Sequence, residues 1–234
     1  MLPSTPIPRR GYACGSFRHV LLKGLLVTLS TWFVSGSGAH AQPAAARRVV
    51  VRSYNTIGLP LATISHAEKA VGELLRDAGI DSTWRNCRTV DGPSSQSADP
   101  CDDVLSASEV VVRIVRTPHA ITHVEVLGYS HVDAYRRQGT LATVFADRVR
   151  VLAAALRIDE GTLLGRAVTH ELGHLLLGTL DHSETGLMRG AWDTAGRRRS
   201  DWLFSSAEAT QMRAGLQARS LSSLLAVAQT PPSR

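Results

Sequence analysis

An apolar stretch in the second half of the chain, residues 162–178, carries two histidines and a glutamate among its leucines. Its apolar residues fall on nearly every side of a helix with 3.6 residues per turn, which predicts a buried helix. These residues are Leu163, Leu164, Val168, Leu172, Leu175, Leu176 and Leu177. His170 and His174 are four residues apart, so their imidazoles point to the same side of that helix. Buried histidines are costly unless something satisfies their nitrogens, and a metal ion would do so.

Glu171 completes the pattern His-Glu-x-x-His, which is typical of zinc hydrolases. Two neutral imidazoles at this spacing can hold one zinc ion at about 2.0–2.1 Å each. The carboxylate of Glu171 would lie beside the ion, where it can take a proton from a water molecule that zinc activates. An amphipathic helix with two surface histidines would show the same short pattern, but the apolar residues around the helix argue against a surface position.

Beyond this helix the sequence resembles the metzincin metalloproteases, and within them the matrixin-like members. Their signature is His-Glu-x-x-His-x-x-Gly-x-x-His, followed by a tight turn that carries a methionine beneath the zinc. The chain has the residues of this signature in the same order: His170, Glu171, His174, Gly178, His182 and Met188. The resemblance implies that His182 is the third zinc ligand and that Met188 is the methionine of the turn.

Two spacings depart from the signature. Gly178 falls one residue later than in the family pattern, and His182 falls two residues later. Asp181 therefore stays open as a substitute for His182. Glu208 is a further alternative, because thermolysin-like peptidases also take their third ligand from a position well downstream.

Residues 1–41 contain four basic residues and no acidic residue. Their apolar run at 21–34 is shorter than the roughly 20 residues of a membrane span, and Ala39-His40-Ala41 has the small-x-small form of a cleavage site. We predict a signal peptide at 1–41, with an uncleaved anchor as the alternative, and one metalloprotease-like domain at 42–234 with a frayed tail at 230–234.

Without 1–41 the chain has 22 basic and 20 acidic residues, which gives no indication of nucleic-acid binding.

Three cysteines are present, and Cys14 would be removed with the signal peptide. Cys87 and Cys101 would then be the only cysteines of an exported protein, which favours a disulfide between them. Zinc binding by these cysteines is the weaker alternative, because no second cysteine or histidine pair lies near them at ligand spacing.

Strands are predicted at 47–54, 82–85, 109–116, 123–130 and 140–146 from their β-branched residues. Helices are predicted at 61–78, 148–156 and from about 162 to 178, and a capping box, Ser205-x-x-Glu208, opens a last helix. This order predicts an α+β fold. The resemblance, which covers most of 47–226 but is specific only at 170–188, implies a metzincin-like zincin fold. In that fold a twisted mixed sheet lies over the active-site helix, followed by the Met-turn and a C-terminal helix.

Gly128 and Tyr129 fall in one of the predicted strands. In metzincins the strand nearest the cleft is an edge strand that runs antiparallel to bound substrate. The resemblance makes Gly128 and Tyr129 candidates for this substrate-binding edge, whose backbone groups could pair with an extended peptide. Half-buried packing of Tyr129 is the alternative.

Together these features predict an exported zinc-dependent endopeptidase, secreted or periplasmic, that uses Glu171 as the general base on peptide or protein substrates. The protein is expected to be a monomer, with no nucleic-acid partner and no stable membrane insertion after signal cleavage. A secreted binding domain with a structural zinc ion and no catalytic activity is the alternative from another class. Glu171 favours the enzyme, because a structural zinc site does not require it.

Overall fold

The computed structural model describes residues 47–87, 101–123, 125–192 and 198–228. The predicted signal peptide at 1–41 and the predicted tail at 230–234 lie outside these residues.

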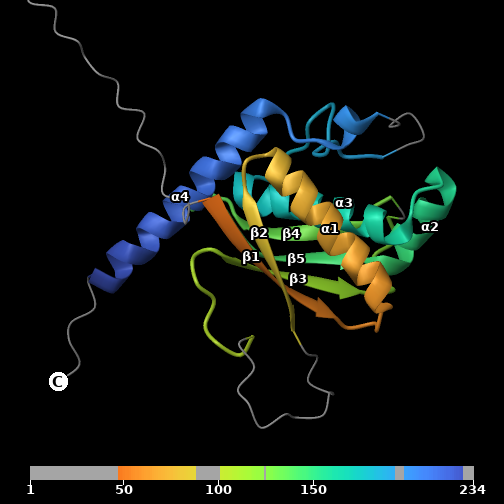
Figure 1. Ribbon diagram of the computed structural model, residues 1–234, viewed down its shortest axis with the longest axis horizontal. Helices are drawn as coiled ribbons and strands as arrows, with labels where there is room; N and C mark the ends of the chain where they lie inside the picture. Colours follow the sequence, from red (N-terminus) through yellow and green to blue (C-terminus); the bar gives the residue numbers. More distant parts are fainter. Residues whose placement is uncertain (1–46, 88–100, 124, 193–197, 229–234) are drawn as a thin grey trace, which may run out of the picture. The chain divides into compact units, whose positions relative to one another are not determined.

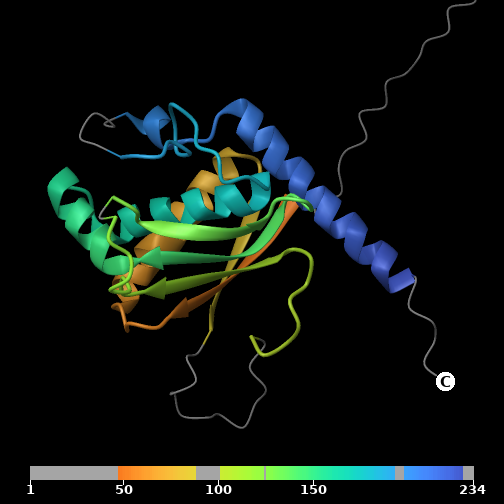
Figure 2. The same ribbon diagram turned by 180° about the vertical axis from the view of Figure 1, so that it is seen from behind.

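Five strands form one mixed sheet in the order β2-β1-β3-β5-β4. They are β1 (Arg48–Asn55), β2 (Asp81–Cys87), β3 (Glu109–Val115), β4 (Gly128–Asp133) and β5 (Gln138–Phe145). β1 runs parallel to β2 and β3, and β3 runs parallel to β5. β4 pairs with β5 in the antiparallel direction and forms one edge of the sheet. This edge is in front in Figure 2.

Among the residues that the structure describes, four α-helices and a short 3₁₀ helix accompany the sheet: α1 (Leu61–Asp77), α2 (Ala146–Leu156), α3 (Glu160–Leu177), η2 (Arg199–Trp202) and α4 (Ser206–Ala228). α1 connects the parallel strands β1 and β2, and it packs beside α3 on the same face of the sheet (Figure 1). α3 also packs on β4 and β5, so its buried side chains form the centre of the core. In the described part of the chain, no helix is long and apolar enough to cross a membrane.

The mixed arrangement of helices and strands agrees with the predicted α+β class, but one strand is displaced from its predicted position. A strand was expected at 123–130, whereas β4 begins at Gly128 and continues to Asp133. The guanidinium of Arg148 explains the shift, because it donates hydrogen bonds to the carbonyl oxygens of Ile121 and Val126 at 2.7 Å each. Carbonyl groups that are satisfied by a side chain are not available for a β ladder.

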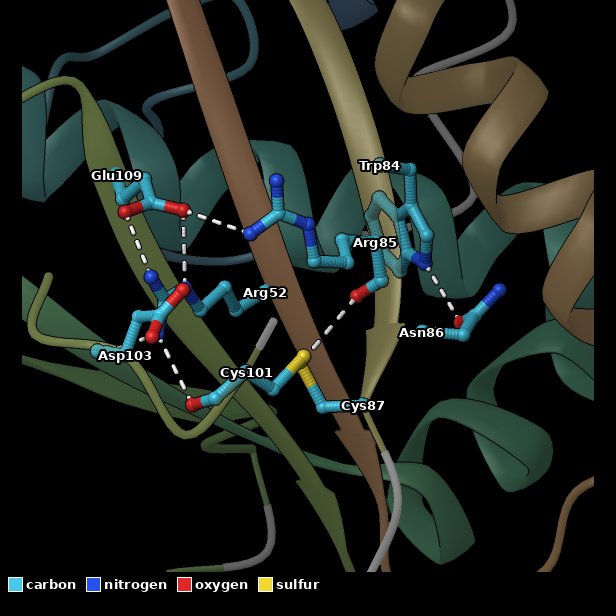
Figure 3. Close-up of a disulfide and its surroundings, with 8 residues drawn as sticks. All are labelled: Arg52, Trp84, Arg85, Asn86, Cys87, Cys101, Asp103 and Glu109. Carbon is cyan, nitrogen blue, oxygen red and sulfur yellow. Dashed lines mark hydrogen bonds and ion pairs between the residues drawn. A yellow bond between two sulfur atoms is a disulfide. The ribbon is translucent and has the colours of Figure 1, made fainter. Parts of the chain in front are cut away.

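The predicted disulfide joins Cys87 at the end of β2 to Cys101, with the Cα atoms 5.7 Å apart. Beside it, a buried arginine on β1 holds the chain that follows Cys101 (Figure 3). Arg52 donates two hydrogen bonds to the carboxylate of Glu109 on β3, at 2.9 and 2.7 Å. It also donates to the carbonyl oxygens of Cys101 and Asp103, at 3.0 and 2.6 Å. The disulfide and this ion pair therefore fix the same segment to the sheet.

Candidate metal centre

The helix that carries the His-Glu-x-x-His pattern has a defined beginning and end. The side chain of Asp159 accepts a hydrogen bond from the backbone N–H of Thr162 at 2.8 Å, which caps the first turn of α3. Gly178 ends the helix in the left-handed conformation, with φ of 68°. Nearly every residue between these caps is buried, as the apolar run predicted. The helix thus presents its two histidines from a rigid, buried position.

Three imidazoles meet at one point. The Nε2 atom of His170 lies 3.1 Å from Nε2 of His174 and 3.3 Å from Nε2 of His182. One ligand atom from each of the three histidines lies within 4.8 Å of the others. Two ligands bound to one ion at about 2.0–2.1 Å in tetrahedral geometry would be about 3.3 Å apart. The structure therefore brings together the three histidines named by the sequence, in an arrangement that could hold a metal ion.

Backbone carbonyl groups orient two of the imidazoles. Nδ1 of His170 lies 2.8 Å from the carbonyl oxygen of Leu187, and Nδ1 of His174 lies 2.9 Å from that of Thr179. A carbonyl oxygen can only accept, so each Nδ1 carries the proton and each Nε2 presents a lone pair. These two carbonyl groups were not foreseen from the sequence, because backbone positions leave no side-chain signal.

Burial keeps both helical imidazoles neutral. It lowers the pKa of His170 to about 4, and it also lowers the pKa of His174. Two neutral imidazoles with lone pairs facing each other at 3.1 Å repel unless a cation lies between them. The chemistry of this donor set therefore fits a metal ion.

The turn after His182 is closed by backbone hydrogen bonds. The N–H of Ser183 donates to the carbonyl oxygen of Met188 at 2.9 Å, and Gly186 has a positive φ of 75°. Met188 is buried, and its sulfur lies so close to Gly173 on α3 that a Cβ atom there would overlap it. Met188 therefore lies against α3 at the turn of the helix between the two histidines.

Glu171 points to the other wall of the site, formed by β4. Its carboxylate accepts a hydrogen bond from Ser130 Oγ at 2.7 Å. A Cβ atom at Gly128 would lie 2.9 Å from Glu171 Oε1, so the strand approaches the carboxylate closely there. Burial raises the pKa of Glu171 to about 7, against the opposing effect of the Ser130 hydrogen bond. Ser130 was missed as a site residue, although its place two residues after Gly128 puts both on one face of a strand.

Asp181 and Glu208, the alternatives to His182 as the third ligand, form hydrogen bonds elsewhere. Asp181 accepts a hydrogen bond from Thr179 Oγ1 at 2.7 Å. Glu208 closes the predicted capping box of α4, where it accepts from the N–H of Ser205 at 2.7 Å, and it also bonds Ser183. Neither carboxylate belongs to the group of three histidines among the residues that the structure describes.

Tyr129 and the aromatic residues near the histidines complete the surroundings. Tyr129 on β4 is 38% exposed, and the centroid of its ring lies 5.9 Å from that of Phe145, so the ring both packs on Phe145 and remains accessible. Trp192, which the sequence did not single out, contacts the ring of His170 edge-on at 5.6 Å.

No known protein-family model matches the chain, and a search among curated proteins found no match either. The chemistry of the site must therefore be inferred from the geometry of its own residues.

Proposed function

We propose that the protein is a zinc-dependent endopeptidase of metzincin-like fold. The observation that carries the proposal is the convergence of three Nε2 atoms, from His170, His174 and His182, beside the buried carboxylate of Glu171. Three histidine ligands with a fourth position open are characteristic of catalytic zinc sites, whereas structural sites have four protein ligands. A structural zinc site does not require a carboxylate beside its ligands, so Glu171 favours an enzyme over a structural zinc site.

The surrounding fold supports the same family. A mixed sheet packed on α3, a turn with Met188 against that helix, and a C-terminal helix agree with the arrangement expected from the metzincin resemblance. Zinc is the metal we propose, because imidazole ligands at tetrahedral spacing suit it. When bound, zinc would act as a Lewis acid that polarises the peptide carbonyl and acidifies a water molecule.

Glu171 would perform the proton transfers. A carboxylate whose pKa lies near neutrality can accept a proton from water and return it to the leaving amine. Ser130 Oγ at 2.7 Å fixes one carboxylate oxygen, which leaves the other free for this exchange. Gly128 brings the backbone of β4 next to the carboxylate, so a substrate on that strand would lie beside the reacting groups.

The substrate would be an extended peptide bound along β4. This strand forms an edge of the sheet and pairs on one side with β5. An edge strand can add a peptide through main-chain hydrogen bonds, which tolerates many side chains. We further propose that the protein is exported, to the periplasm or outside the cell, because the Cys87–Cys101 disulfide suits an oxidising compartment.

The decisive experiment replaces Glu171 with glutamine in the mature protein. The change keeps the size of the side chain but removes its basicity, so zinc content and melting temperature should stay nearly constant. Hydrolysis of mixed peptides should fall by about 10²–10⁴-fold, the usual contribution of general-base catalysis. Glu160→Gln, a change of the same kind in the first turn of α3, is the matched control and should retain activity.

Zinc content is measured in parallel by elemental analysis. The unmutated protein should hold one zinc ion per chain after zinc-replete refolding, and His170→Ala should abolish binding. Absence of zinc from the unmutated protein would overturn the proposal. A protein that binds zinc but shows no chelator-sensitive hydrolysis would instead be the catalytically silent domain.

A further inference from the structure

A cavity of about 760 Å³ lies between α1, the end of α2, the beginning of α3 and η2. Its apolar lining includes Leu74, Ile158 and Trp202, and its positive lining includes Arg157, Arg166 and Arg198. None of the three histidines and neither Glu171 nor Ser130 lines it. The cavity is therefore separate from the candidate metal centre.

The two acidic residues that line this cavity, Glu73 and Asp77, interact with Arg199. Asp77 accepts from the guanidinium of Arg199 at 2.7 Å, and Glu73 also acts on Arg199 electrostatically. For Arg166, in contrast, burial is the only influence on its pKa, and no hydrogen bond or ion pair joins it to another residue in the described part of the chain. Its guanidinium instead lies over the ring of Trp202, 4.1 Å from the centroid. Burial lowers the pKa of Arg166, and no carboxylate opposes this effect.

A second arginine, Arg189, also lies near Trp202, although it does not line the cavity. The guanidinium of Arg189 lies 5.3 Å from the centroid of the same ring. Its Nε and Nη2 atoms are buried and have no hydrogen-bond partner among the residues that the structure describes. The contact of each guanidinium with the indole ring is attractive but does not replace hydrogen bonds, so an anion that accepts from these N–H groups would offset the cost of their burial.

We propose that this cavity binds an organic carboxylate that carries an apolar group. The guanidinium of Arg166 would hold the carboxylate through paired N–H donors, a geometry that suits a planar fork. The apolar group would rest on Leu74, Ile158 and Trp202. A monoanion fits better than a phosphate dianion, because the half-buried site makes each additional charge costly to desolvate. The carboxylate can come from a peptide C-terminus or from a small apolar acid, which present the same chemistry.

The probe is N-acetyl-phenylalanine, compared with N-acetyl-phenylalaninamide, which has the same shape but no charge. Isothermal titration of the mature chain should show the acid binding at least about tenfold more tightly, since a charge-assisted hydrogen bond contributes about 1.5–3 kcal/mol. Arg166→Gln should erase this preference. Arg136→Gln removes the same charge from an exposed position in the β4–β5 turn and should leave the preference unchanged.

Each titration is repeated after chelator treatment, because a metal ion can also bind carboxylates. The acid should bind equally with and without metal, so the outcome does not depend on the proposed peptidase activity.

Two further probes distinguish the two sources of the carboxylate. Stronger binding of an acetylated peptide with a free C-terminal phenylalanine indicates a peptide C-terminus, and stronger binding of 3-phenylpropanoate indicates a small acid. If Arg166→Gln does not fold, Arg166→Lys, which keeps the charge but loses the fork, should weaken binding of the acid. Equal affinity for acid and amide, loss of binding with chelator, or no binding of the acid at 10 mM would overturn the proposal.

Discussion

His182 lies close to His170 and His174, although it comes two residues later in the chain than the last histidine of the metzincin signature that the sequence resembles. One additional residue extends α3 before Gly178, and another lengthens the turn that leads to His182. The N–H of Gly178 still bonds the carbonyl oxygen of His174 at 2.9 Å, so the helix ends normally despite the insertion. At the scale of single residues, the three histidines follow the order of the signature that the sequence resembles, but not its spacing.

The proposed set of three histidine ligands predicts opposite effects of two substitutions on zinc affinity. His182→Ala should weaken binding by more than the roughly 10–100-fold that loss of an outer partner costs, because it removes a ligand. Glu208→Ala should leave zinc affinity nearly unchanged and lower stability by about 1 kcal/mol through the lost cap of α4. Competition with a chromophoric chelator measures the first effect, and thermal unfolding measures the second. The thermolysin-like alternative requires the reverse order of zinc affinities.

The helices and strands differ in how well their positions could be predicted. α3 could be predicted because its apolar residues, its cap and its terminal glycine are all local in sequence. β4 could not be positioned correctly, because Val126 is β-branched and favours a strand, whereas its carbonyl oxygen accepts a hydrogen bond from Arg148. That contact depends on the folded arrangement of α2 against the loop. Local sequence propensity therefore predicts where helices and strands lie, except where a side chain from another segment forms hydrogen bonds with the backbone groups of a predicted strand.

Glycines on two helices predict opposite responses to the same substitution. Gly173→Ala should destabilise the protein by about 1–3 kcal/mol, because the added carbon overlaps the sulfur of Met188 and the ring of Phe204. Gly72→Ala on α1 meets only Ser82 Oγ at 3.8 Å, and should stabilise by up to about 1 kcal/mol through better helix propensity. With about 2–4 °C per kcal/mol for a domain of this size, thermal unfolding resolves both changes. A stabilising Gly173→Ala would mean that Met188 does not pack against the helix.

Across the whole molecule, contacts between distant segments show the limit of sequence reasoning. The Cys87–Cys101 pair could be predicted from a count of cysteines. The ion pair between Arg52 and Glu109 could not, because the partners are 57 positions apart on different strands and neither forms a recognisable motif. The same holds for the hydrogen bond between Ser130 and Glu171, 41 positions apart. Such pairs follow from sheet order and packing, which the sequence indicates only at the level of fold class.

The buried ion pair near the disulfide predicts how the stability of the whole domain depends on pH. Hydrogen bonds from Arg52 (Figure 3), and to a lesser extent from Ser106, lower the pKa of Glu109 from its ordinary value of 4.5 to about 2. The folded state therefore binds this proton more weakly than the unfolded state. The stabilising contribution is fully present above about pH 4.5 and is lost as the pH falls through about 2. At about 1.4 kcal/mol per pKa unit, the contribution is about 3 kcal/mol.

The measurement is the free energy of unfolding by denaturant between pH 2 and 5, for the unmutated protein and for Arg52→Gln/Glu109→Gln. The double variant keeps hydrogen-bonding groups at both positions but has no titrating group there, so its stability should fall less on acidification. The difference between the two proteins should shrink by about 3 kcal/mol from pH 5 to pH 2. Glu109→Gln alone should destabilise by about 3–5 kcal/mol at neutral pH, because it leaves the buried charge of Arg52 without a counterion. Parallel pH profiles would show that Glu109 has the same pKa in the folded and unfolded states, contrary to the buried pair described here.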